Sequence, residues 1–317
     1  STVPAVPVQL GGVRFRLPGA PRAPRGLSSA LDAAGDAVGD GRAPMLRPWR
    51  SDVPSLLTHA GLVARADRFD ASAFAVSEGE ARHMDPQQRL LLETAYASLH
   101  AACVDAGHAG RVASSLDDDV AVYVGLMNLD FASDAAGGDC VFDATGSQAS
   151  IASGRLSYAM GLQGPCATVD TACSSSLVAM SAAVAHVPSI GVGACAAAVS
   201  LMLSPRSSAL FAGAGMLSRD GRCKTWDARA NGYVRSEAVA AVALLRAAVA
   251  RGGACVASSI LVRADGRSAS LTAPNGAAQR RLLAGAPMRT AIDLEAHGTG
   301  TALGDPTEAR AAMAVYG

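Results

Sequence analysis

Residues 167–179 have the sequence ATVDTACSSSLVA, and this stretch decides the fold. Its first half is short, β-branched and apolar, which predicts a buried strand. The small and apolar residues from Ser175 onward predict the start of a helix. Cys173 is therefore expected on a strand-to-helix turn, where the first helical N–H groups and the helix dipole lower the pKa of a thiol. This placement predicts a nucleophilic cysteine; the alternative is an inert, buried one.

A second informative stretch is LEAHGTGTALGDPTE, residues 294–308. An apolar segment leads into His297, and a loop of glycines and threonines follows before a helix begins. Asp305 as N-cap, a proline at the first helical position and Glu308 at the third predict a capping box with a structural role. A lone histidine is usually structural. Together with Cys173 on a nucleophile turn, however, His297 becomes a candidate acid/base or hydrogen-bond donor.

The composition limits the classes of partner. Half of the 317 residues are hydrophobic and only 17% are charged, with Lys+Arg and Asp+Glu equal at 27 each. With a net charge of zero, the composition gives no sign of the excess positive charge that binding to nucleic acid or an anionic membrane needs. The length is sufficient for a large core in one big domain or two halves.

The seven cysteines and the acidic residues indicate neither disulfides nor a metal site. An odd number of cysteines without a CxxC pair argues against a disulfide framework and a zinc site. A reducing compartment is expected, namely the cytoplasm, with an organelle left open. The acidic run 117–119 predicts a solvated turn rather than a cation site. The N-terminus has no pattern of a signal peptide.

Residues 171–205 contain no charged side chain, which is also a property of membrane spans. The run includes three consecutive serines, His186 and Pro188. We therefore predict a nucleophile turn, a buried helix and a buried central strand, as in α/β proteins, and no membrane span.

Strands alternate with helices along the chain, which indicates an α/β fold with buried sheets. Asp85 is predicted to cap a helix that ends near Ala102, with Gln88 completing a capping box. Residues 126–147 and 204–234 are predicted to be mostly loop. A further helix is expected at Ala149–Ser157, and further strands at Val6–Phe15, Val120–Gly125, Ala194–Leu203, Ala238–Leu245, Cys255–Arg263 and Ala291–Ala296.

Two of these motifs together resemble a known family. DTACSSS at 170–176 resembles the active-cysteine motif of β-ketoacyl synthases of modular polyketide synthases, and EAHGTGT at 295–301 resembles their first histidine motif. Further matches along the chain are MDPQQRLLLE at 84–93, GRLSY at 154–158, NGYVR at 231–235 and LTAPNG at 271–276.

The resemblance implies the thiolase-like fold, in which two α/β halves pack as five layers, α-β-α-β-α. Residues 1–250 would form the N-terminal half with the nucleophilic cysteine. Residues 251–317 would be the start of the C-terminal half, which in the family continues past Gly317, so the second half is expected to be incomplete.

The resemblance also implies a 3-oxoacyl-[acyl-carrier-protein] synthase of polyketide or fatty-acid biosynthesis. Cys173 would carry the acyl group, and His297 would hydrogen-bond the thioester oxygen of a malonyl-type extender during decarboxylative Claisen condensation. Thr299 and Thr301 would line the slot for the phosphopantetheine arm of acyl carrier protein. No bound cofactor is implied, and a homodimer is the expected assembly.

The sequence departs from the family at several points. The family's lysine, second histidine and Gly-Phe-Gly segment lie beyond residue 317. Ala197-Ala198, Ser236, Ala238 and Ala240 stand where glycines are expected, and a methyl group can block close backbone approach. Two alternatives therefore stay open. One is a catalytically incomplete thiolase-fold remnant that acts as a dimerisation or docking partner. The other is a thiol hydrolase or simple acyltransferase that uses only Cys173 and His297.

Overall fold

The computed structural model describes residues 8–18, 59–105, 119–131, 140–187, 193–246, 256–286 and 293–317. The strands are β1 (Val8–Arg16), β2 (Ala121–Leu126), β3 (Cys166–Val169), β4 (Ala194–Ser200), β5 (Ala238–Arg246) and β6 (Val256–Ala257). The helices are η2 (Ser72–Phe74), α2 (Glu78–His83), α3 (Pro86–Asp105), α6 (Val141–Gly146), α7 (Ala149–Met160), α8 (Ser175–His186), α9 (Pro205–Gly213), α10 (Gly276–Ala284) and α11 (Gly304–Tyr316).

One mixed sheet organises these elements, in the order β3-β2-β4-β5-β1-β6. β3, β2 and β4 are parallel, whereas β5, β1 and β6 join by antiparallel pairing. Gly125 in β2 is level with Val169 in β3 and with Ala198 in β4. The carboxyl ends of the three parallel strands therefore meet at one edge, which is where ligands bind in α/β sheets.

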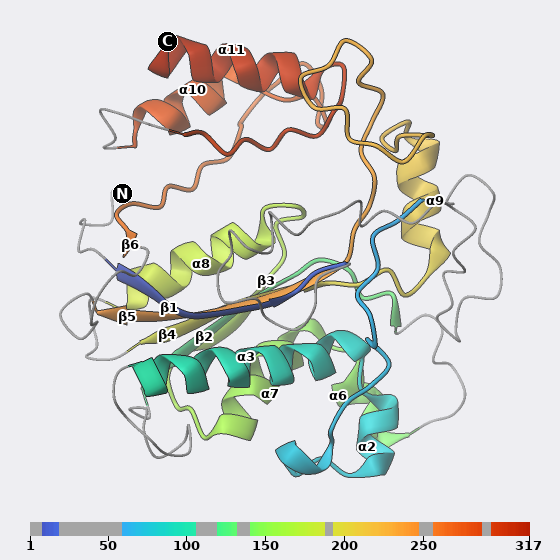
Figure 1. Ribbon diagram of the computed structural model, residues 1–317, viewed down its shortest axis with the longest axis vertical. Coiled ribbons are helices and arrows are strands. Elements are labelled where there is room, and N and C mark those ends of the chain that lie inside the picture. The colour runs from blue at the N-terminus through green and yellow to red at the C-terminus, as the bar shows by residue number, and fades with distance from the viewer. Residues whose placement is uncertain are drawn as a thin grey trace.

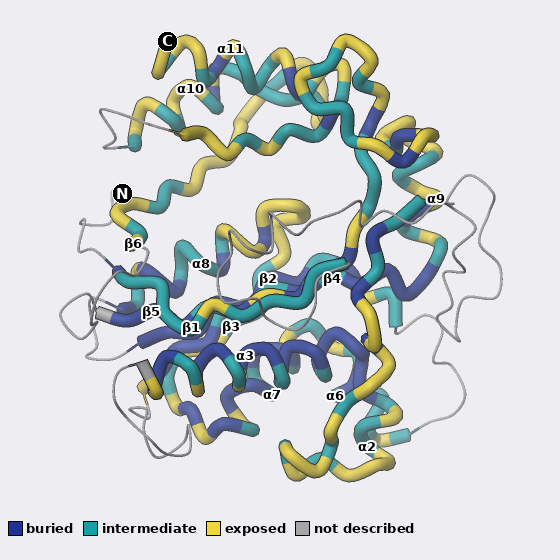
Figure 2. The backbone as a smooth tube through the Cα atoms, viewed as in Figure 1, coloured by how far each residue is buried: buried dark blue, intermediate teal, exposed yellow. Residues whose placement is uncertain are grey.

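Helices cover both faces of the sheet (Figure 1). α3 packs on β1, β4 and β5, and α7 packs on β2 and β3, whereas α8 covers β2, β3 and β4 from the other side. Each interface has its own core of buried residues, visible along α3 and the strands in Figure 2. The described residues thus supply an α-β-α stack, which is the first three layers of the expected thiolase-like arrangement. α10 and α11 pack on each other beyond α8.

Most of the predicted elements are confirmed. The expected strands at 6–15, 120–125, 194–203 and 238–245 correspond to β1, β2, β4 and β5. Helix α7 agrees with the prediction and continues one turn further. The uncharged run 171–205 forms the turn, α8 and β4, and none of the helices within the described ranges is long and apolar enough to cross a membrane.

Two strand predictions are wrong. Of Cys255–Arg263, the structure describes residues 256–263, and among these only Val256–Ala257 pairs with β1. Of Ala291–Ala296, the described residues 293–296 are irregular. An apolar run becomes a strand only where a neighbouring strand takes its backbone hydrogen bonds, and in the described residues these segments lack such a neighbour.

Two helices occupy stretches that were predicted to be loop. α6 lies within 126–147 and α9 within 204–234. The start signal of α9 is present in the sequence, since Ser204 accepts a hydrogen bond from the Arg206 N–H at 3.3 Å and a proline follows Ser204 directly.

The two predicted capping boxes are also wrong in part. Asp85 does cap α3, because its Oδ1 accepts from the Gln87 N–H at 2.7 Å. Gln88 does not close the box; its Nε2 donates to the Gly146 carbonyl at 3.0 Å, and the Asp85 N–H donates to the same carbonyl at 2.9 Å. α11 begins at Gly304 with Leu303 as N-cap, so Asp305 lies inside its first turn.

Candidate active site

The turn that carries Cys173 is closed by its own neighbours. Ser175 Oγ accepts from the Thr171 N–H at 2.9 Å and donates to the Ala172 carbonyl at 2.7 Å. The Ala172 N–H donates to Asp170 Oδ1 at 2.9 Å. Ala172 has a φ of 55°, a left-handed conformation that is unusual for a residue with a Cβ. Such local strain is typical of functional turns, and it leaves Cys173 exposed directly before α8.

A glycine in the neighbouring strand sets the position of this turn. A Cβ on Gly125 would lie 2.7 Å from the Ser175 carbonyl carbon and 2.7 Å from the Ser176 nitrogen. The start of α8 therefore rests directly on the backbone of β2, which only glycine allows. The end of β2 thus fixes the height of Cys173 above the sheet.

The loop that carries His297 is held from α11. Glu308 accepts from the His297 N–H at 2.7 Å through Oε1 and from the Gly298 N–H at 2.9 Å through Oε2. Thr225 Oγ1 donates to the Gly298 carbonyl at 2.6 Å. The predicted capping residue Glu308 therefore positions the histidine loop instead of capping its own helix.

Asp305 holds the next part of the same loop. This buried carboxylate accepts from the Gly300 N–H and from the Trp226 N–H, each at 3.0 Å. Gly300 has a φ of 69°, and a Cβ there would lie 2.9 Å from the Cys223 carbonyl carbon. A glycine is required at this position because of both the conformation and the close approach.

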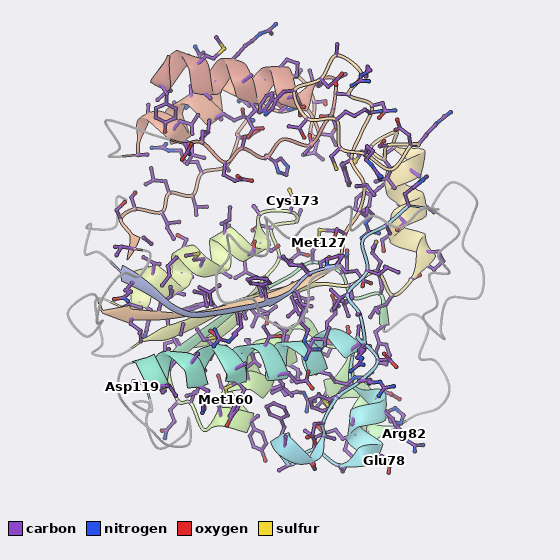
Figure 3. All side chains as sticks on the ribbon, in the orientation of Figure 1. Glu78, Arg82, Asp119, Met127, Met160 and Cys173 are labelled. Carbon is purple, nitrogen blue, oxygen red and sulfur yellow. The ribbon has the colours of Figure 1, made fainter. Side chains whose placement is uncertain are left out.

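The structure brings Cys173 and His297 close together, and hydrogen bonding to His297 is the first cause of a lowered pKa of the thiol. The imidazole charge and the backbone N–H groups of Cys173 and Ser174 lower the pKa further, whereas burial raises it. The same hydrogen bond raises the pKa of His297, with smaller contributions from Glu308 and Asp305. These shifts favour a thiolate–imidazolium pair. In Figure 3, Cys173 lies between the sheet and the segment that bears α10 and α11.

The two predicted substrate-binding threonines lie on the histidine loop. Their Oγ1 atoms are 3.0 Å apart, and Thr301 Oγ1 accepts from the Gly304 N–H at 3.1 Å. Thr299 and Thr301 thus accompany His297 on one short segment.

Tyr233 was not predicted as a site residue. Burial raises the pKa of its phenol, and the charge of Cys173 adds to this shift. Its segment is tied to the histidine loop, because the Gly232 N–H donates to the Gly300 carbonyl at 2.9 Å. The match of NGYVR to the family was the signal in the sequence that could have identified Tyr233.

The alanines at expected glycine positions fit into the sheet. Ala197 and Ala198 of β4 lie opposite Ala241 and Ala240 of β5 in an unbroken register. Their methyl groups therefore do not disrupt the strands next to the site. Within the described ranges, no group of three or more His, Cys, Asp or Glu side chains could hold a metal ion.

Comparison with known proteins agrees with this geometry. The family profile "Beta-ketoacyl synthase, N-terminal domain" matches residues 6–250, and "Beta-ketoacyl synthase, C-terminal domain" matches residues 254–317. The ketosynthase from module 6 of the bacillaene synthase of Bacillus subtilis 168 superimposes with a TM-score of 0.78 at 29% identity, over 98% of this chain and 54% of that chain.

Curated relatives point the same way. The Spectinabilin polyketide synthase system protein NorA' of Streptomyces orinoci is 38% identical over 331 residues, which are 99% of this chain and 9% of the relative. Erythronolide synthase EryA3 of Saccharopolyspora erythraea is 37% identical over 98% of this chain and 10% of the relative. The chain thus spans about a tenth of the length of these relatives.

The fold and its match to a solved ketosynthase define the class, a protein of the thiolase-like fold. The profile match over most of its length then assigns the family: the chain belongs to the β-ketoacyl synthases.

Proposed function

We propose that this chain is the condensing region of a modular type I polyketide synthase, a 3-oxoacyl-[acyl-carrier-protein] synthase that carries out decarboxylative Claisen condensation. The observation that carries the proposal is the exposed Cys173 on a strained turn, where Cys173 and His297 shift each other's pKa in opposite directions. A thiol with a lowered pKa beside an imidazole is the arrangement that acyl transfer to cysteine needs.

The reaction has two stages. The Cys173 thiolate attacks the carbonyl of an acyl thioester; a new C–S bond forms, the old one breaks, and the carrier leaves as a thiol after it takes the proton of the His297 imidazolium. A malonyl-type extender then loses CO₂, and its α-carbon attacks the acyl group and releases the Cys173 thiolate. His297 donates a hydrogen bond to the extender's thioester oxygen as negative charge develops there.

The proposal also assigns residues to the binding of acyl carrier protein and its phosphopantetheine arm. Thr299 and Thr301, which share the loop of His297, are assigned to the slot for the phosphopantetheine arm of acyl carrier protein. The N–H of Cys173 is assigned to half of an oxyanion hole. The halves 1–250 and 251–317 are kept as the domain division, and the family profiles, which end at 250 and begin at 254, support it.

A homodimer is part of the proposal. β3 stands at the edge of the sheet and is partly exposed, and the exposed side chains of Tyr158 and Leu177 lie on the helices that flank it. An edge strand with apolar neighbours is suited to pairing with a second copy. The six free cysteines of the described residues fit a reducing location, for which we retain the cytoplasm.

A thiol hydrolase is the weaker candidate. Glu308 takes the backbone N–H of His297, and no carboxylate in the described ranges has a hydrogen bond to its ring. The histidine therefore lacks the orienting group that hydrolytic Cys–His pairs use. The docking-remnant alternative rests on the lost glycines and on the family segments expected beyond residue 317, and the regular β4–β5 register weakens only the first of these arguments.

The test is acylation followed by condensation. The chain is incubated with an acyl thioester, and the peptide that contains Cys173 is analysed by mass spectrometry; a malonyl thioester of acyl carrier protein is then added. We expect the acyl mass on Cys173, its absence in Cys173→Ala, and its presence in the control Cys223→Ala. A 3-oxoacyl product with CO₂ supports the full proposal. No acylation would favour the remnant, and free acid without CO₂ would favour the hydrolase.

A further inference from the structure

The motif MDPQQR at 84–89 does more than begin a helix. Gln87 is fully buried, and its amide spans two loops: Oε1 accepts from the Leu201 N–H at 3.0 Å, and Nε2 donates to the Asn128 carbonyl at 2.7 Å. Leu201 follows β4 and Asn128 follows β2. One side chain therefore cross-links the loops at the carboxyl ends of two adjacent parallel strands.

Residues 201–204, which connect β4 to α9, are irregular and buried; none is more than 6% exposed. A buried irregular segment must find partners for its N–H groups outside a helix or sheet. Besides Gln87, Glu237 Oε1 accepts from the Met202 N–H at 2.9 Å, and Asp130 Oδ2 accepts from the Ser204 N–H at 3.4 Å. Three side chains from three distant segments thus fix one short connection.

The other ends of these side chains extend the network. Glu237, also fully buried, accepts from the Val63 N–H at 2.9 Å. Asp130 Oδ1 accepts from Ser207 Oγ at 2.7 Å, which ties the loop after β2 to the first turn of α9. A buried network of this kind rigidifies what it holds when its members are satisfied.

The network lies at the edge of the sheet that carries Cys173. Gly125 pairs with both Val169 and Ala198. The loops after β2 and β4 and the nucleophile turn after β3 therefore all begin at the same edge of the sheet. Figure 3 shows Met127, which follows β2, at this edge with Cys173. An acyl group on Cys173 is therefore expected beside these loops, since ligands of α/β sheets bind outside the carboxyl ends of the strands.

We propose that Gln87, Asp130 and Glu237 are positioning residues that hold residues 201–204 as the buried layer behind the acyl site. The inference rests on the proposed function, because it presupposes that Cys173 carries an acyl group. It predicts that loosening this buried layer changes which acyl groups Cys173 accepts, while the thiol itself stays intact. Hydrogen bonds that hold the segments around a site in place determine how precisely the site is shaped.

The chain provides a matched control in Gln88. This neighbouring glutamine is also buried and hydrogen-bonded, but its partners are the Gly146 carbonyl and Arg155 Nε, on the α6–α7 side. Gln87→Met and Gln88→Met therefore remove comparable hydrogen bonds from the same turn of α3. Only the first of them touches the connection after β4.

The experiment measures the rate of Cys173 acylation by acetyl and octanoyl thioesters of N-acetylcysteamine, well below the unfolding temperature of each variant. Gln87→Met is expected to change the octanoyl-to-acetyl rate ratio by about tenfold, the scale on which acyl-site shape discriminates substrates. Gln88→Met is expected to keep the wild-type ratio. The rate of Cys173 alkylation by iodoacetamide should stay within about twofold in both variants.

Equal ratios in the two variants would overturn the inference and leave the proposed function standing. A wild-type chain that is alkylated but takes neither acyl group would overturn both. If Gln87→Met does not fold, Asp130→Asn decides by the same ratio, because the amide retains an oxygen for Ser207 and loses the one for Ser204. An unchanged ratio there would also contradict the inference.

Discussion

The turn that carries Cys173 and the loop that carries His297 meet at one site, where each residue shifts the pKa of the other, but they are built differently. Ser175 closes the cysteine turn through residues only three and four positions away. The histidine loop depends on Glu308, on Asp305 and on Thr225, a residue from a separate segment. The nucleophile is thus encoded locally, whereas the position of its partner depends on contacts that join distant parts of the chain.

The comparison shows where the site is sensitive. The position of the cysteine turn depends on its packing against β2. Its own hydrogen bonds fix the shape of the turn, but they do not fix where the turn lies on the sheet. The histidine loop depends on a pair of carboxylates, because its own backbone is rich in glycine and has little intrinsic preference for one conformation.

The largest effect is expected for Gly125→Ala. The added methyl group would lie 2.7 Å from backbone atoms of Ser175 and Ser176, so the start of α8 must shift. We expect a loss of about 3 kcal/mol in the free energy of unfolding and a fall in Cys173 acylation of about 100-fold. Denaturant titration and acylation kinetics measure the two effects.

Gly154→Ala is the control for this change. Gly154 lies inside α7, and beyond the helix's own backbone and its two chain neighbours nothing lies within 4 Å of an added Cβ, so alanine should stabilise the helix by about 0.5–1 kcal/mol. If Gly125→Ala has the same stability and the same rate of Cys173 acylation as Gly154→Ala, packing of the cysteine turn on β2 does not position the nucleophile.

A smaller effect is expected for Glu308→Gln. The amide keeps one acceptor oxygen for the histidine loop and presents an NH₂ group to the other backbone N–H. We expect a loss of about 1–2 kcal/mol in stability and about tenfold slower condensation, with the pKa of Cys173 moving up as the hydrogen bond to His297 weakens. Calorimetry, product formation and the pH profile of alkylation report these effects.

Asp293→Asn provides the matched change, since this exposed carboxylate lies on the same segment. It should leave stability and activity within experimental scatter. Equal stability and activity of the two variants would mean that the histidine loop keeps its conformation without Glu308. The contrast with the cysteine turn would then be wrong.

This contrast also explains what the sequence could predict. The turn at Cys173, the strand before it and α8 follow from short-range patterns, and each was predicted; the predicted burial of the strand is wrong, because β3 lies at the edge of the sheet and is partly exposed. The packing of β2 against α8 through Gly125 depends on a register that no local pattern contains. The strand expected at 255–263 failed for the same reason, since pairing partners are not visible in an apolar run.

The side-chain roles near the helix starts show a further limit. Asp85 followed the capping rule, yet Gln87, Gln88 and Glu308 use their side chains on other segments. Capping signatures describe what a side chain can reach within its own helix. They cannot show that a loop from elsewhere offers an unsatisfied N–H group that binds it instead.

The central claim is that Cys173 and His297 form one chemical unit, and the pH dependence of Cys173 alkylation tests it most directly. The thiolate is the reactive form, so the rate rises with pH through the pKa of the thiol. The hydrogen bond and charge of His297 lower that pKa, so the wild-type midpoint should lie below that of an ordinary thiol. Cys195 serves as an internal reference, because burial raises its pKa to about 12 and it should stay unlabelled.

In His297→Ala the midpoint should move up, and alkylation at neutral pH should slow about tenfold, the scale of one charge-assisted hydrogen bond. Identical midpoints in the wild type and in His297→Ala would contradict the account, because Cys173 would then owe its reactivity to the helix start alone.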